Sequence, residues 1–166
     1  MTMTYNGDNG IQIDGNLVIN NYPENSSMDF DLIEFESLIN DMYSCCFNKS
    51  GGGFDFVQIK IEEKNRINKL EFYFNEKIKK DIVYFKPLHE FILNSEDDFR
   101  AKVEYVAETI RSFVIEDGTS ELTQEKIQKI IKKFYEQKWN FKQKQYAIVF
   151  IHYLYFACLI GKKEQQ

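Results

Sequence analysis

The sequence of 166 residues predicts an α+β fold that is mainly helical, with a helical domain around a buried C-terminal helix. Three observations lead to this prediction. Residues 146–160 form a run of apolar, aromatic and thiol side chains that only His152 interrupts, and a helix that is apolar on every side must be buried on every side. Apolar residues recur at spacings of three and four through much of the chain. Two stretches, 11–19 and 57–74, read as strands instead.

Composition indicates one globular chain that is long enough to bury a core. Hydrophobic residues make up 43% and charged residues 28%, whereas the aromatic content of 16% is high and suits either a core or an interface. The net charge of −5 is uneven, because residues 1–63 contain eleven acidic and two basic residues and the remainder is basic. An acidic N-terminal part could meet a basic surface in the same chain or on a partner. Two differently solvated faces explain the asymmetry equally well.

The first 22 residues are predicted to form an Asn/Gly-rich β-hairpin. Asp14-Gly15-Asn16, a tight-turn signal, separates Ile11–Ile13 from Leu17–Ile19. A lone hairpin is marginal in water, so it needs further strands. We expect an assembly or partner arm that pairs with another chain, with docking on its own body or disorder as the alternatives. Its candidate partner-binding residues are Ile11, Ile13, Val18 and Ile19.

Residues 23–166 are predicted to form a single, mainly helical domain. Ser26 or Ser27 is expected to cap a first helix whose apolar stripe runs from Leu32 to Cys46. A small antiparallel hairpin should follow, because apolar and polar residues alternate over 57–62 and again over 69–74.

The chain from Asn75 onward is predicted to be helical. Pro87 should kink or split the first of these helices. Ser95 should cap the next, which Asp117-Gly118 ends, and Thr123 should open another before the central helix.

No catalytic, metal or cofactor site is predicted. Cys45, Cys46 and Cys158 are odd in number and lack CxxC spacing, which disfavours both disulfides and structural zinc. His89 and His152 have no neighbouring residue at ligand spacing, and His152 is expected to be a hydrogen-bonded core histidine. With no nucleophile–base motif, we expect neither enzymatic activity nor a cofactor. The apolar run is too short to span a bilayer and no signal peptide is evident, so the expected location is cytoplasmic.

The stretch 126–144 combines seven lysines and one glutamate with aromatic residues. This composition suits a partner-binding surface, a single-strand nucleic-acid surface or a solvated helix face. The stretch contains no arginine and the chain is acidic overall, so nucleic-acid binding is the alternative and not the first hypothesis. The candidate residues are Tyr135, Trp139 and Phe141 for a protein partner, and Lys126, Lys129, Lys132 and Lys133 for nucleic acid.

Two segments carry a family resemblance. KLEFYFNEKIKKDIVYFKPLHEFI and the closing HYLYFACLIGKK, together with the opening hairpin, resemble the C-terminal domain shared by bacterial ABC-three-component conflict systems. The resemblance covers residues 65–162. It implies a domain that couples an effector to an SMC-like ABC ATPase and a small middle component, in defence against phage or plasmids.

The resemblance implies a non-catalytic adaptor in this chain. Only the predicted hairpin and one acidic helix precede the domain, and neither carries a nuclease or protease signature. The expected partners are therefore proteins, including the SMC-like ABC ATPase and an effector on another chain, with nucleic acid bound only indirectly or weakly. A small homo-oligomeric scaffold, assembled through the N-terminal hairpin, is a further alternative.

Overall fold

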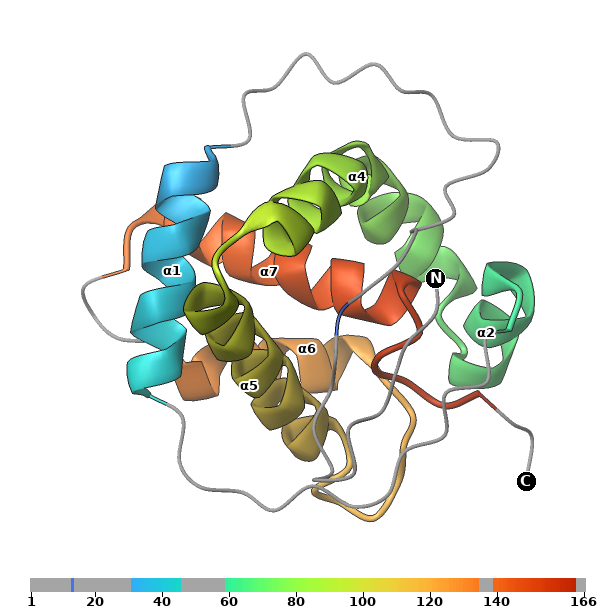
Figure 1. Ribbon diagram of the computed structural model, residues 1–166. Coiled ribbons are helices and arrows are strands. Elements are labelled where there is room, and N and C mark those ends of the chain that lie inside the picture. Colours follow the sequence, from blue (N-terminus) through green and yellow to red (C-terminus); the bar gives the residue numbers. More distant parts are fainter. Residues whose placement is uncertain (1–12, 14–30, 46–58, 135–138, 164–166) are drawn as a thin grey trace.

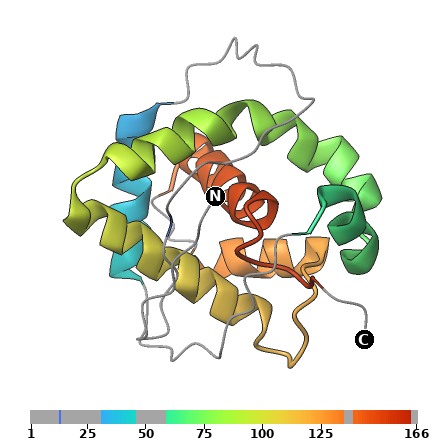
Figure 2. The ribbon, with the colours of Figure 1, turned by 45° about the vertical axis from the view of Figure 1, so that its right-hand side comes forward.

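Helix α7, Phe141–Phe156, runs through the middle of the structure with the other helices around it (Figure 1). Figure 2 shows it close to end-on, with α1, α4, α5 and α6 surrounding it. The computed structural model describes residues 13, 31–45, 59–134 and 139–163. None of the helices in these ranges is long and apolar enough to cross a membrane.

The sequence run 146–160 forms the predicted buried centre. Every residue from 149 to 155 is buried, and residues 157–160 remain buried after the helix has ended at Phe156. Asn140 begins the helix with a capping box, because its side chain accepts from the Gln143 N–H while the Gln143 side chain accepts from the Asn140 N–H. Contacts to α1, α4 and α6 cover its sides.

Helix α1, Leu32–Ser44, has the apolar stripe that its sequence predicts. Asp31 caps it by accepting from the backbone N–H groups of Ile33 and Glu34. The predicted caps, Ser26 and Ser27, lie outside the described residues. The buried side chains of the stripe are Phe35, Leu38, Ile39 and Met42.

The predicted hairpin over 57–74 is wrong, and with it the α+β class, because the described residues contain no strand. Helix α2, Ile61–Asn68, occupies the first part of this stretch, and α3, Glu71–Tyr73, begins a second helix soon after it. Alternation predicts that Phe72 is buried with its neighbours, yet Phe72 is 81% exposed. Leu70 and Phe74 are buried, as the alternation also predicts, but they form a helical stripe with Ile78 at four-residue spacing.

The helix that begins with α3 continues without interruption through the π-helical segment η1, Phe74–Ile78, into α4, Lys79–Asn94. Pro87 lies inside α4 and does not end it. The N-terminal hairpin lies outside the described residues, with the exception of Ile13.

Helices α5, Asp97–Val114, and α6, Gln124–Phe134, complete the arrangement. Thr123 caps α6 as predicted, because its hydroxyl accepts from the Lys126 N–H. Ser95 does not cap α5. Its hydroxyl donates to the Phe91 carbonyl at the end of α4, and Glu96 takes the N-cap position.

Candidate ligand pocket

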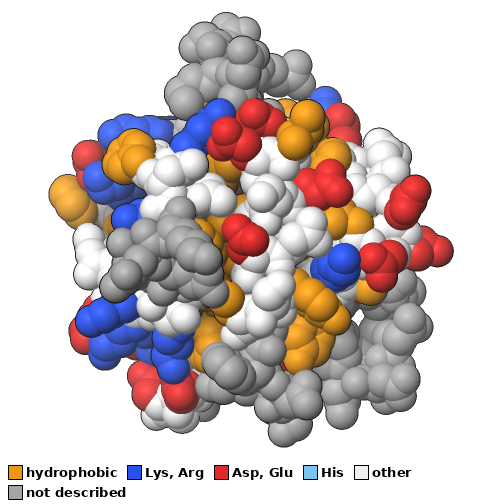
Figure 3. All heavy atoms as spheres, turned by 90° about the vertical axis from the view of Figure 1, so that its left-hand side faces the viewer, with side chains coloured by type: hydrophobic (Ala, Val, Ile, Leu, Met, Phe, Trp, Pro, Cys, Tyr) orange, Lys and Arg blue, Asp and Glu red, His pale blue; other side chains and the backbone are white. Residues whose placement is uncertain are grey.

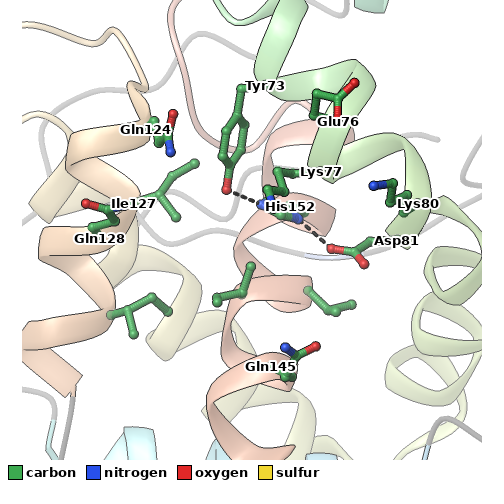
Figure 4. Close-up of a pocket in the computed structure, with 13 residues that line it drawn as sticks. Tyr73, Glu76, Lys77, Lys80, Asp81, Gln124, Ile127, Gln128, Gln145 and His152 are labelled. Carbon is green, nitrogen blue, oxygen red and sulfur yellow. Dashed lines mark hydrogen bonds and ion pairs between the residues drawn. The ribbon is translucent and has the colours of Figure 1, made fainter. Parts of the chain in front are cut away.

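A pocket of about 560 Å³ opens between α4 and α6, with one face of α7 as its floor (Figure 4). Gln145, Ile148, Val149 and His152 contribute the floor, because residues three, four and seven positions apart share one helix face. The segment from α3 to α4 forms one wall and α6 forms the other. The wall residues are Tyr73, Glu76, Lys77, Lys80 and Asp81 on the first side, and Gln124, Ile127, Gln128 and Ile131 on the second.

Three polar side chains at one end of the pocket form a hydrogen-bonded chain. His152 Nδ1 lies 2.6 Å from Asp81 Oδ2, and its Nε2 lies 2.8 Å from the Tyr73 hydroxyl. An ionised carboxylate only accepts, so Nδ1 carries the proton that it donates to Asp81, and in the neutral ring Nε2 accepts from Tyr73. The chain joins α7 to both ends of η1. π-Helical turns of this kind occur often at functional sites.

The Tyr73 hydroxyl is held in its neutral form. Burial, helped by the charge of Asp81, raises its pKa to about 12. A phenol with so high a pKa is a poor nucleophile, but it is a good hydrogen-bonding group. While the Tyr73 hydroxyl donates a hydrogen bond to His152, its oxygen can still accept a hydrogen bond from an N–H or O–H group of a ligand. Tyr73 is therefore suited to hydrogen bonding with a ligand at this position.

Charges line the α3–α4 wall but not the α6 wall. Lys77 and Lys80 form no ion pair with any described residue, although Glu76 lies four positions before Lys80. In Figure 4 the Glu76 carboxylate points away from the Tyr73 hydroxyl. The opposite wall presents the uncharged amides of Gln124 and Gln128. The pocket thus combines cationic, acidic, amide and apolar groups.

A comparison with known families identifies the chain. A family model of C-terminal domain 12 of the ABC-three component systems matches residues 35–161. The chain belongs to this family. The predicted resemblance is confirmed, and the match starts earlier than the predicted 65, so that it includes most of α1. No curated protein and no solved structure matches the chain.

Membership makes this chain a component of a multi-component system, for which protein partners are plausible. The aromatic residues that were predicted to bind such partners lie in different environments. Phe141 is 77% exposed at the start of α7, whereas Trp139 is only 5% exposed and packs in the core. Tyr135 lies outside the described residues.

The four lysines of the nucleic-acid alternative all belong to α6, but three of them are engaged. Lys126 donates to Asp117 and to the Val114 carbonyl. Lys129 pairs with Glu125, and Lys133 pairs with Glu116. The fourth, Lys132, is exposed.

Of the predicted hairpin residues, only Ile13 is described. Its side chain is fully buried, and its backbone N–H donates to Glu104 Oε1 on α5 at 3.0 Å. This single residue therefore contacts the chain's own body. Ile11, Val18 and Ile19 lie outside the described residues.

Sequence reasoning missed the pocket. His152 is a hydrogen-bonded buried histidine, as predicted, but its partners Tyr73 and Asp81 are 79 and 71 residues away. The available signal was the polar interruption of an apolar helix by Gln145 and His152 on one face. Two polar residues seven positions apart indicate that this face of the helix is not packed entirely against apolar side chains.

A second unusual group lies beneath the C-terminal segment. Lys64 on α2 is fully buried, and its Nζ donates to the Tyr155 carbonyl and lies 4.2 Å from the centroid of the Tyr155 ring. Burial lowers its pKa to about 7. No described carboxylate forms an ion pair with Lys64, so removing its charged amine from water destabilises the folded chain.

Proposed function

We propose that this chain is a non-catalytic adaptor subunit of a bacterial defence complex and that it works by binding protein partners. The family match over residues 35–161 carries this proposal, because it covers nearly all of the described helical body and assigns it to a three-component system. A subunit of such a system needs surfaces for other subunits. The surface of the helical body supplies a candidate.

The candidate surface lies where α1 and α7 begin. Lys142 on α7 pairs with Glu34 on α1 at 3.2 Å, so the two helix starts are held together. Beside this contact, Ile33 is 80% exposed and Phe141 is 77% exposed. Aromatic residues such as Phe141 are enriched at protein interfaces, and an exposed aliphatic neighbour adds apolar area to such a surface.

The face that carries α1 is mixed in character (Figure 3). Hydrophobic side chains are scattered among charged ones; basic side chains gather mostly toward the left edge of this view, whereas acidic side chains occur across the face. Non-obligate interfaces have a mixed composition of this kind. This composition supports a surface that binds another protein.

The pairing of the α6 lysines disfavours the nucleic-acid alternative. A lysine gains phosphate affinity by releasing counterions, and a lysine that is already neutralised by a carboxylate contributes less. Lys126, Lys129 and Lys133 each have such a carboxylate partner. We therefore place the protein-binding proposal before the nucleic-acid alternative.

Co-expression tests the proposal. The chain, with an affinity tag, would be produced together with an ABC ATPase and a middle component of an ABC-three component system from the same source, and the mass of the complex would be measured by light scattering. We expect a stable complex that Phe141→Asp weakens by about tenfold or more, since burying a charge in an interface core is costly. Phe72→Asp is the matched control, because Phe72 is equally exposed but lies on α3. If neither component binds the wild-type chain, the proposal is wrong.

A further inference from the structure

The floor of the pocket on α7 begins at Gln145, one helical turn beyond Phe141, and the pocket's groups are arranged for a particular kind of ligand. We propose that it binds the free C-terminal end of a partner polypeptide whose last residue is apolar. This inference rests on the proposed function, since it specifies how a partner of the adaptor is recognised. Four features of the pocket carry it.

The first feature is the acceptor at the inner end. Asp81 fixes the tautomer of His152, and in the neutral ring Nε2 accepts a hydrogen bond from the Tyr73 hydroxyl, so the Tyr73 oxygen can accept a hydrogen bond from a ligand in the pocket. The side chain of His152 is only 2% exposed, which leaves this end closed. A backbone N–H of a bound peptide is a suitable donor for that oxygen.

The second feature is the apolar floor beside this acceptor. Ile148 and Val149 lie one helical turn before His152 on α7, which is a separation of about 5.4 Å along the helix. Ile127 and Ile131 of α6 face the same space. One amino-acid residue spans this separation, with its N–H at Tyr73 and its apolar side chain on the floor.

The third feature is the pair of lysines on the α3–α4 wall, which also carries Glu76 and the Asp81 carboxylate that pairs with His152. Lys77 and Lys80 form no ion pair with a described residue, in contrast to Lys126, Lys129 and Lys133. A terminal carboxylate carries its charge next to the backbone N–H and the side chain of the same residue. The two lysines on the Tyr73 wall can therefore pair with it while the other two contacts form.

The fourth feature is the amide lining. Gln124, Gln128 and Gln145 each present one donor and one acceptor group, the same pair that a peptide unit presents. They suit the peptide groups that precede the last residue. A volume of about 560 Å³ holds a short chain end, whereas an α-helix with its side chains is about 10–12 Å wide and would fit for only about one turn.

The test uses short probe peptides and the full chain. Three peptides would be titrated separately into the protein: acetyl-Gly-Gly-Leu as the free acid, the same peptide as its C-terminal amide, and acetyl-Gly-Gly-Glu amide. The third peptide carries its carboxylate on a side chain and not at the chain end. Binding would be measured by ¹⁵N chemical-shift changes, which also locate the site. We expect the free acid to shift residues of the pocket floor and the amide to bind about tenfold more weakly.

Variants provide the second part of the test. Lys77→Gln combined with Lys80→Gln should weaken free-acid binding about tenfold, and Tyr73→Phe should weaken it several-fold. Lys79→Gln is the matched control, because Lys79 is an exposed lysine of the same helix that does not line the pocket. A melting curve for each variant shows that it is folded.

Three outcomes overturn the inference: no binding of the free acid at millimolar concentration, equal binding of acid and amide, or preference for the side-chain carboxylate. If these occur while the chain still co-purifies with the ATPase or the middle component, the pocket assignment is wrong and the adaptor proposal stands. If the free acid binds in the pocket but no component co-purifies, the adaptor proposal is wrong.

Discussion

Replacing Lys64 with Met should stabilise the protein, and the gain should depend on pH. Lys64 is fully buried and unpaired by any described carboxylate, and burial lowers its pKa to about 7 from an ordinary value of 10.5. Met has a similar length and no charge. The hydrogen bond to the Tyr155 carbonyl is lost, but the N–H of Cys158 continues to bond to that carbonyl.

The size of the effect follows from the lowered pKa. Between pH 7 and pH 10.5 the unfolded chain holds a proton on Lys64 that the folded chain has released, so stability rises with pH in this window. Each pH unit is worth about 1.4 kcal/mol, which gives a full cost of about 5 kcal/mol below the window. Subtracting about 1 kcal/mol for the lost hydrogen bond and a similar sum for imperfect packing leaves a gain of roughly 3 kcal/mol near pH 7.

Urea denaturation at several pH values between about 7 and about 9.5 measures this difference. The wild-type free energy of unfolding should approach that of Lys64→Met as pH rises, because the cost of the amine disappears as it loses its proton in the unfolded chain. Lys60→Met, at an exposed neighbouring position, should show no such convergence. Parallel curves for wild type and Lys64→Met, or a variant several kcal/mol less stable at every pH, would refute the reasoning.

Three further predictions concern other single positions. Burial raises the pKa of Glu108, whose side chain is 13% exposed, to about 7. Between pH 4.5 and pH 7 the folded chain holds a proton that the unfolded chain has released, so the free energy of unfolding should fall by up to about 3 kcal/mol as pH rises through this window. Glu108→Gln should abolish this pH dependence in thermal melts. Gly161→Ala should destabilise the chain by several kcal/mol in urea, because φ is +91° and the new Cβ would lie 2.9 Å from ring carbons of Tyr155; Gly118→Ala, with φ +82° and nothing within 4 Å of its Cβ, should cost only about 1–2 kcal/mol. Tyr73→Phe removes one partly buried hydrogen bond and should lower the free energy of unfolding, measured in urea, by about 1–2 kcal/mol; a loss several times larger would contradict a local role for this hydrogen bond.

Much of the helical body could be predicted because its signals are local. The stripe of α1 and the cap of α6 at Thr123 depend on residues three or four positions apart, and these spacings have one physical interpretation. The prediction of strands over 57–74 was wrong because the alternating runs are short, so that strand and helix periodicities both fit them. The sequence around Leu70 and Phe72 does not indicate which of these two side chains other helices will bury.

The pocket could not be predicted for a different reason. It depends on three segments that are distant in the chain and meet only because α4 and α6 pack on opposite sides of one face of α7. Ion pairing is equally hidden, since the lysines of α6 form a basic stretch in the sequence whereas Glu116 and Asp117 neutralise two of them in space.

The sequence by itself determined that most of residues 146–160 are buried, because fifteen side chains with only one strongly polar member are more stable away from water in any fold. It also determined the family, through motifs that are read without coordinates. Only the tertiary structure decided that Lys64, a residue that would ordinarily be solvated, is buried beneath Tyr155 and Gly161, and that His152 joins Tyr73 to Asp81. Burial of a polar group depends on which surfaces the rest of the chain places over it, and no local pattern encodes that choice.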